Sequence, residues 1–253
     1  MDRRREASPL RLLSFNLRYS EARDGNNIWK NRRPLVAEIL NTYRPDVAGF
    51  QEVLIDQLHD LEAMLPDYRW ADVGRLNGKQ RGEFALLFFR NLKAAETGYF
   101  WLSDTPERPS NTWGGQHRIC TWARFDHPRP FTVFNTHLES DVAIARARSV
   151  PLLSRKYKEL AGDAPGFLIG DFNLKPNSRE NRRMSREFRD SFSGKRSANT
   201  LVTSHSFTGC KRNLLWRWGG QGRIDYIWVR GQIRVLQARI LHDRLGDDPR
   251  IYP

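Results

Sequence analysis

The stretch GFLIGDFN, residues 166–173, is an apolar run that ends on two polar residues, Asp171 and Asn173. Such a run, bounded by Gly, Asp and Asn, is typical of a β-strand. A polar side chain at the end of a strand is held rigidly and is aimed into the cleft that the strand end borders. The stretch therefore predicts a strand and, at its carboxyl end, part of a functional site.

Four other apolar runs carry polar residues at their ends in the same way. Asn16 follows LLSF, Glu52 closes VAGFQE, His137 closes FTVFNTH, and Asp225 lies in RIDYIWV. One such residue alone is usually a turn or cap residue. The recurrence of the pattern favours a shared site at the ends of several strands.

The whole chain is rich in strand-like runs, with helical patterns between some of them. The strands are expected in 10–19, 45–53, 84–90, 118–125, 131–138, 166–173, 223–230 and 233–241, and the helices in 29–44, 54–65, 141–160 and 181–192. Pro151 should kink or split the third helix. Because strands and helices do not alternate strictly, we expect an α+β fold, a four-layer α/β/β/α sandwich with two packed mixed sheets. A single domain over residues 1–253 is expected.

The composition is that of an ordinary globular chain, with 39% hydrophobic and 28% charged residues. A net charge of +13, mostly from arginine, favours an anionic phosphoester substrate, with nucleic acid among the candidates. Cys120 and Cys210 form no CxxC motif, and no apolar stretch is long enough to span a membrane. We expect a cytoplasmic monomer.

Carboxylate and amide oxygens select hard cations, so Mg²⁺ is the expected cofactor, with Mn²⁺ as an alternative. Mg²⁺ is held by a few carboxylates, several waters and substrate phosphate oxygens. A nearby histidine can donate a hydrogen bond or a proton to a phosphoryl oxygen. These residue types together point to chemistry on an anionic phosphoester.

At these residues the chain resembles the endonuclease/exonuclease/phosphatase superfamily of metal-dependent phosphoesterases. The resemblance is carried, in family order, by SFNLRY, PDVAGFQEV, RGEFALLFFR, FNTHLES, GDFNLKP and GRIDYIWV. It implies the sandwich fold already expected and a phosphodiesterase or nuclease that directs a water molecule in line at phosphorus. The shared motifs do not choose between a diester and a small phosphomonoester.

The resemblance also implies a role for each matching residue. Glu52 is the principal metal ligand, and Asn16 completes or supports the metal–water shell. Asp171 orients or deprotonates the attacking water, and Asn173 holds the water or the phosphate. The remaining roles are those of His137, which contacts a phosphate oxygen or the leaving group, Glu83, which orients that histidine, and Asp225, which supports a second histidine. Glu83 beside His137 would favour the protonated imidazolium.

Near the end of the chain, GDDPRIYP matches the approach to a family motif that continues Ser-Asp-His. The sequence stops at Pro253, which suggests a truncation before that Asp-His pair and a final strand. The alternative is a catalytically impaired relic that binds phosphate or nucleic acid. In the long loop 100–117 and just after it, Trp113, His117 and Arg118 are possible contacts to the substrate.

Overall fold

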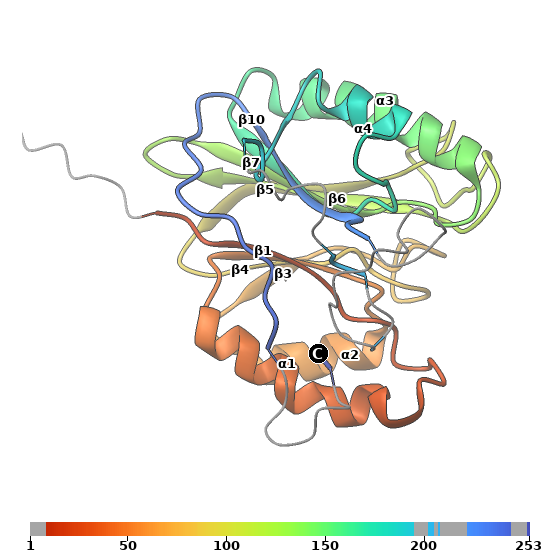
Figure 1. Cartoon of the computed structure of the whole chain (residues 1–253), viewed down its shortest axis with the longest axis vertical. Helices are drawn as coiled ribbons and strands as arrows, with labels where there is room; N and C mark the ends of the chain where they lie inside the picture. Colours follow the sequence, from red (N-terminus) through yellow and green to blue (C-terminus); the bar gives the residue numbers. More distant parts are fainter. Residues whose placement is uncertain (1–8, 195–201, 205–206, 208–221, 244–251) are drawn as a thin grey trace, which may run out of the picture.

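The structure is a computed structural model, and it describes residues 9–194, 202–204, 207, 222–243 and 252–253. Two mixed β-sheets pack face to face, and helices cover their outer faces (Figure 1). The expected four-layer α/β/β/α sandwich is confirmed.

The smaller sheet has four strands in the order β1-β2-β4-β3. Its strands are β1 (Leu12–Asn16), β2 (Val47–Gln51), β3 (Arg69–Ala71) and β4 (Leu87–Phe89). The larger sheet has six strands in the order β5-β6-β7-β8-β10-β9. Its strands are β5 (Lys93–Trp101), β6 (Ile119–Asp126), β7 (Phe131–His137), β8 (Gly166–Asp171), β9 (Arg189–Asp190) and β10 (Asp225–Arg230).

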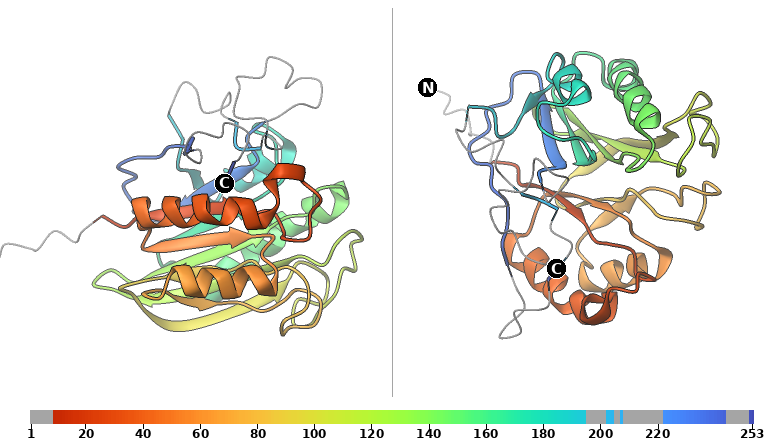
Figure 2. Two further views of the ribbon diagram at one scale, coloured as in Figure 1. Left: turned by 90° about the horizontal axis from the view of Figure 1, so that it is seen from below. Right: turned by 45° about the vertical axis from the view of Figure 1, so that its right-hand side comes forward.

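The helices divide between the two outer faces. They are α1 (Trp29–Tyr43), α2 (Ile55–Met64), α3 (Ala143–Ala161) and α4 (Arg179–Met184), with a short 3-10 turn, η1 (Gly25–Asn27), before α1. Figures 1 and 2 show α1 and α2 outside the four-stranded sheet, and α3 and α4 outside the six-stranded one. Each helix thus buries one apolar side against a sheet.

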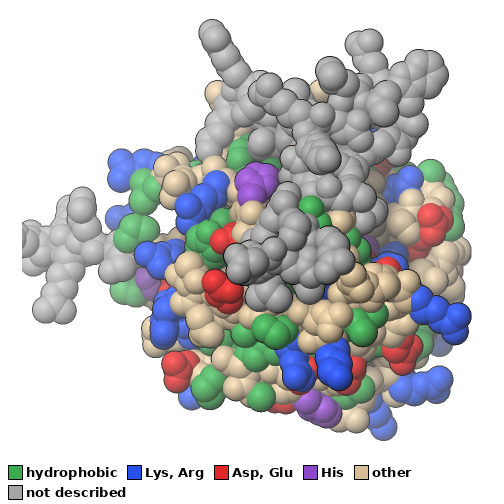
Figure 3. Space-filling model, turned by 60° about the horizontal axis from the view of Figure 1, so that its bottom comes forward, with side chains coloured by type: hydrophobic (Ala, Val, Ile, Leu, Met, Phe, Trp, Pro, Cys, Tyr) green, Lys and Arg blue, Asp and Glu red, His purple; other side chains and the backbone are tan. Residues whose placement is uncertain are grey.

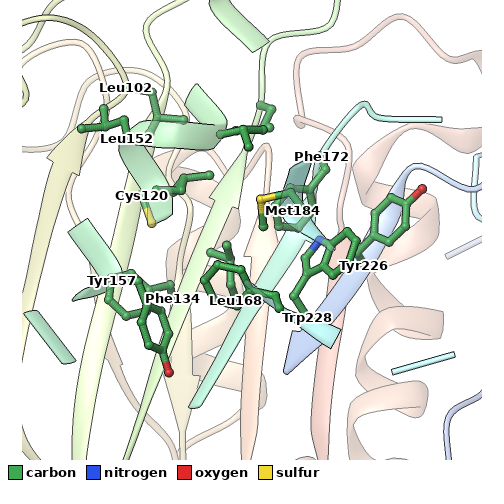
Figure 4. Packing of buried hydrophobic residues seen from close by; sticks show 14 of the residues in the cluster. Leu102, Cys120, Phe134, Leu152, Tyr157, Leu168, Phe172, Met184, Tyr226 and Trp228 are labelled. Atoms are coloured by element: carbon green, nitrogen blue, oxygen red, sulfur yellow. The ribbon is translucent and has the colours of Figure 1, made fainter. Parts of the chain in front are cut away.

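Three apolar clusters hold these layers together. One lies between α1, α2 and the small sheet, a second between the two sheets, and a third between the large sheet, α3 and α4. Figure 4 shows the third, in which Tyr226 and Trp228 of β10 pack near Phe172 and Met184. The core therefore runs through the whole thickness of the sandwich and fixes the sheets relative to each other.

A buried amide pair also crosses between the sheets. Gln51 Nε2 donates to Asn135 Oδ1 at 2.7 Å, and Asn135 Nδ2 donates to the carbonyl oxygens of Phe50 and Leu86. A Cβ atom on Gly49 of β2 would lie 2.8 Å from Cγ of Asn135 on β7. The close approach of the two sheets at this point therefore requires glycine. These hydrogen bonds set the sheet-to-sheet register next to the strand ends that carry the candidate site.

Two parallel strand pairs bring polar ends to one edge of the sandwich. Strands β1 and β2 are parallel, with Asn16 opposite Gln51, and strands β7 and β8 are parallel, with His137 opposite Asp171. Strand β10 runs antiparallel to β8, so its first residue, Asp225, lies opposite Asp171. The carboxyl ends of the parallel strands and the start of β10 therefore meet at the same place.

Gly170, just before Asp171, has a backbone conformation that other residues rarely adopt. Its φ is +142°, and a Cβ atom there would lie 1.9 Å from the carbonyl oxygen of Thr136. The glycine of the GDFN motif thus lets β8 approach β7 closely at the residue that precedes the candidate catalytic carboxylate.

The expected strand at 233–241 is wrong, because no strand is assigned there. Residues 231–243 form an extended segment in which Ile233 and Val235 pack against the cluster between the sheets. These two residues are partly buried without joining a ladder, whereas Leu236 is 60% exposed. Strand β5 was not predicted, since it is an edge strand whose first seven residues are mostly exposed and polar or small.

The third helix is one continuous element, so the expectation that Pro151 would split it is wrong. Proline removes one hydrogen bond, to the carbonyl of Ala147, and the rest of the helix is held by buried side chains such as Leu152, Leu153 and Tyr157. The fourth helix is shorter than predicted, because residues 189 and 190 pair with β10 as β9.

Candidate active site

The polar residues expected at strand ends lie together where the two sheets meet. His137, Asp171 and Asp225 lie on neighbouring strands of the large sheet. In the small sheet Asn16 ends β1 opposite Gln51 of β2, and Glu52 is the next residue after Gln51. The contact between sheets is made by Asn16, whose Nδ2 lies 3.1 Å from Oδ2 of Asp171. Residues far apart in the sequence thus share one site.

Asn16 holds two carboxylates with one amide group. Its Nδ2 donates to Glu52 Oε1 at 2.9 Å as well as to Asp171, while its Oδ1 accepts from the backbone N–H of Arg18 at 2.9 Å. The bond from Arg18 fixes which way the amide faces.

Glu52 has a left-handed backbone, with φ of +59°, which is uncommon for a residue with a side chain. Its Oε2 accepts a long hydrogen bond from Tyr19 N at 3.4 Å and lies 3.8 Å from Nη1 of Arg18. Non-glycine residues in such conformations persist where surrounding contacts hold them, and they cluster at functional sites. The turn after β2 therefore aims the Glu52 carboxylate at Asn16.

Asp171 and Asp225 are carboxyl groups in a poorly solvated place. Burial and, next, the negative charge of Asp225 hold the pKa of Asp171 well above its ordinary value. Burial likewise raises the pKa of Asp225, and Glu52 adds to that effect. Asp171 also accepts from Asn173 N, at 3.0 Å on Oδ1. Three carboxylates therefore repel one another within one small region.

His137 is buried, and its surroundings favour the neutral ring. Burial and then the positive charges of Arg118 and Arg75 lower the pKa of His137 well below its ordinary value. Its Nε2 lies 3.1 Å from Nδ2 of Asn173, which also donates to the carbonyl of Leu138 at 2.9 Å. Because that amide is a donor, Nε2 is the acceptor and the ring proton lies on Nδ1.

The prediction that His137 is a charged imidazolium is therefore wrong. Glu83, which was expected to orient the histidine, pairs with an arginine instead. Oε1 of Glu83 pairs with Nη2 of Arg75 at 2.8 Å. Among the residues described, Nδ1 of His137 has no hydrogen-bond partner, although Glu83 and His137 line the same small pocket. Glu83 thus holds an arginine beside the histidine instead of charging the histidine itself.

Two buried arginines line this pocket, and only one of them, Arg118, was expected from the sequence to lie near the substrate. Arg75 and Arg118 are 8% and 7% exposed, and they border the pocket together with Glu52, Glu83 and His137. Arg118, which was considered as a substrate contact, is 3.3 Å from Glu139 through its Nε. Arg75 follows an unremarkable Gly in VGRLNGK, so no local signal distinguishes it from the many surface arginines.

The donor chemistry fits a hard divalent cation that keeps several waters. The described residues contain no group of three or more His, Cys, Asp or Glu side chains with metal-binding geometry. Mg²⁺ usually binds through one or two carboxylates and water rather than in an all-protein cage. Glu52 offers such a carboxylate, and a cation beside it would relieve the repulsion with Asp171 and Asp225.

A sequence model of the Endonuclease/Exonuclease/phosphatase family matches residues 13–247 of this chain. The match spans every residue of the candidate site. It extends over both sheets, so it concerns the whole fold and not one motif.

Solved structures of similar fold agree with that match. An endonuclease/exonuclease/phosphatase of Bacteroides vulgatus is 31% identical with a TM-score of 0.79, covering 88% of this chain and 87% of that one. A mannosyl-6-phosphatase of Bacteroides thetaiotaomicron is 30% identical with a TM-score of 0.78, covering 88% and 86%.

A curated relative, uncharacterized protein L388 of Acanthamoeba polyphaga mimivirus, is 29% identical over 158 residues. The matched residues make up 57% of this chain and 59% of the length of that relative.

Proposed function

Because this chain belongs to the endonuclease/exonuclease/phosphatase family, we propose that it is a Mg²⁺-dependent hydrolase of phosphate esters. The observation that carries the proposal is the meeting of Glu52, Asn16, Asp171 and His137 at one edge of both sheets. Carboxylates that can hold a cation and a water lie there beside a histidine and two arginines. That set suits attack by water on a phosphoryl group.

Asp171 is the residue that we assign to the attacking water. One of its oxygens accepts from Asn16 and the other from Asn173, so the plane of the carboxylate is fixed. Its raised pKa makes it a stronger proton acceptor than an exposed carboxylate. When bound at Glu52, Mg²⁺ supplies positive charge next to the phosphoryl oxygens.

His137 and the arginines are assigned to the phosphoryl oxygens. The neutral ring of His137 carries its proton on Nδ1, and the His137 side chain lines a small pocket together with Arg75 and Arg118. Fixed donors of this kind stabilise negative charge as it develops, and they need no reorganisation during the reaction. Glu83 and Glu139 hold the two guanidinium groups in place.

The class of phosphate ester that the chain hydrolyses is the second part of the proposal. The net charge of +13 favours a phosphodiester such as nucleic acid. A small phosphomonoester is the second candidate, because one relative at 30% identity is a mannosyl-6-phosphatase. On the face shown in Figure 3, Lys and Arg side chains are interspersed with Asp and Glu, which is not the continuous basic surface of a typical nucleic-acid-binding protein.

The test is hydrolysis of bis(p-nitrophenyl) phosphate, p-nitrophenyl phosphate and mannose 6-phosphate, with Mg²⁺ and with EDTA. Asp171→Asn keeps the shape of the side chain but removes the proton acceptor, so kcat should fall about 10²–10⁴-fold. Asp163→Asn, an exposed position away from the site, removes the same charge and should leave kcat unchanged.

The ratio of the rates on the diester and the monoesters decides between the two ester classes. Activity that needs Mg²⁺ and is lost only in Asp171→Asn supports the proposal. A folded chain that binds phosphate but hydrolyses none of the three esters contradicts it, and that result favours the impaired binding protein considered from the sequence.

A further inference from the structure

Glu52, the residue proposed to hold the metal, lies in the turn after β2, and Asn16, which donates to it, ends β1. The turns that follow these two strands each contain one left-handed residue. Arg18, two residues after Asn16, has φ of +53°, and Glu52 has φ of +59°. Neither residue is glycine, so both conformations need support from their surroundings. The question is which group supplies that support to both turns.

One buried side chain, that of Gln57 in the first turn of α2, is bonded to both segments. Its Oε1 accepts from Ser20 N and from Leu54 N, each at 3.0 Å, and its Nε2 donates to the carbonyl of Arg18 at 2.9 Å. Gln57 is 0% exposed. The amide therefore joins the turn after β1 to the segment after Glu52, using both its acceptor and its donor.

Other contacts reinforce the same connection. Nη2 of Arg32, on α1, donates to the same carbonyl of Arg18 at 3.1 Å, and Ser20 Oγ donates to Asp56 Oδ1 at 2.9 Å. Both outer helices thus contribute to the connection between the turns. Gln57 is the only one of these side chains that bonds to the backbone of both segments.

We propose that Gln57 is a positioning residue for the metal site, since it fixes Glu52 and Asn16 relative to each other. This inference rests on the proposed function, because it assumes that Glu52 holds a divalent cation. Partners in the outer shell of a metal site orient its ligands, and their loss typically lowers metal affinity 10–100-fold. Loss of Gln57 should therefore weaken metal binding without removing any ligand.

Gln57 also accepts from Leu54 N, which is a cap at the start of α2, so a purely structural role must be separated from positioning. The test is a titration of the full chain with Mn²⁺, in which the electron paramagnetic resonance signal of the free ion measures how much Mn²⁺ is bound. Thermal unfolding of the same variants measures their stability. Gln57→Met keeps the length of the side chain and loses all three bonds. Leu61→Ala destabilises the same helix through its apolar face and removes none of the three hydrogen bonds of Gln57.

We expect Gln57→Met to bind Mn²⁺ at least tenfold more weakly than the wild type, and Leu61→Ala to bind within twofold of it. Equal affinity in Gln57→Met and the wild type overturns the inference, as does an equal loss in Leu61→Ala. If the wild type itself binds no Mn²⁺, the proposed metal-dependent function fails, and the role of Gln57 fails with it.

A second variant decides the matter if Gln57→Met does not fold. Gln57→Glu keeps the acceptors for Ser20 and Leu54 but cannot donate to Arg18. Coulomb attraction predicts that an added negative charge strengthens cation binding, whereas positioning predicts that binding weakens. Weaker Mn²⁺ binding supports the inference, and unchanged or stronger binding overturns it.

Discussion

At the scale of single residues, the packing between the sheets shifts proton affinities in ways that the sequence does not reveal. Asp72 follows β3 and accepts from Thr121 Oγ1 of the other sheet and from Ala85 N. Burial raises the pKa of Asp72 from 3.8 to about 7. Cys120 is the neighbouring ionisable group on β6, and burial raises the pKa of its thiol as well, so the thiol stays neutral.

This shift predicts a pH-dependent stability. Because the folded-state pKa of Asp72 lies above its unfolded value, the folded chain binds that proton more tightly. The contribution to the free energy of unfolding is full below about pH 4, falls as the pH rises to 7, and is lost above 7.

Asp72→Asn should remove this dependence, because the amide remains neutral at every pH. The variant should match the wild type near pH 4 and be more stable by about 2–4 kcal/mol at pH 8. Urea unfolding of both proteins from pH 4 to 8 measures the difference in their unfolding free energies. The other titrating groups are common to both proteins, so their contributions cancel in this difference. A difference that does not change with pH contradicts the assignment.

His137 illustrates why the site could be predicted only in part from the sequence. Its place at the end of a strand followed from FTVFNTH, and the structure confirms that place. Its neutral state follows from burial and then from the positive charges of Arg118, which directly precedes the neighbouring strand β6, and of Arg75, which lies in a distant turn. Local sequence patterns do not contain such contacts, so the prediction that Glu83 favours a protonated His137 was wrong.

At the scale of elements, apolar strands with clear ends were predictable, whereas edge strands and unpaired segments were not. Strands β7 and β8 are buried along their whole length, so their apolar runs identify them. Strand β5 lies at a sheet edge, and none of its residues before Phe100 is buried. Residues 233–241 have the apolar content of a strand but pack without a ladder partner. Packing against a core and pairing in a sheet are separate properties. An apolar sequence indicates the packing but does not show whether the segment pairs with a strand.

The close approach of β7 and β8 makes Gly170 a critical position. In Gly170→Ala, the added Cβ would meet the carbonyl of Thr136, and φ of +142° would be strained. We expect a loss of at least about 3 kcal/mol of unfolding free energy. Gly162→Ala is the control, since Gly162 also has positive φ but has nothing within 4 Å of an added Cβ.

The control should lose less, about 1–3 kcal/mol, which is the cost of the backbone conformation alone. Chemical denaturation of both variants gives the two values. Equal losses would mean that the close contact between the strands contributes nothing to the requirement for glycine.

At the scale of the whole molecule, the site exists only because two sheets are packed in one register. Asn16 belongs to the small sheet and Asp171 to the large one, and their contact crosses the sandwich. The buried pair Gln51 and Asn135 fixes the same register a few residues away. The motifs predicted which residues take part, but the sandwich geometry that joins them depends on side chains throughout the core.

The measurement that tests this account most directly is a double-mutant cycle between the two sheets. The value of kcat/KM for bis(p-nitrophenyl) phosphate, or for the best ester of the panel, is determined with Mg²⁺ in wild type, Asn16→Ala, Asp171→Ala and the double variant. If the two residues act as one unit, the double variant should be no slower than the slower single variant. Losses that multiply, or a wild type without Mg²⁺-dependent activity, would contradict a site assembled across both sheets.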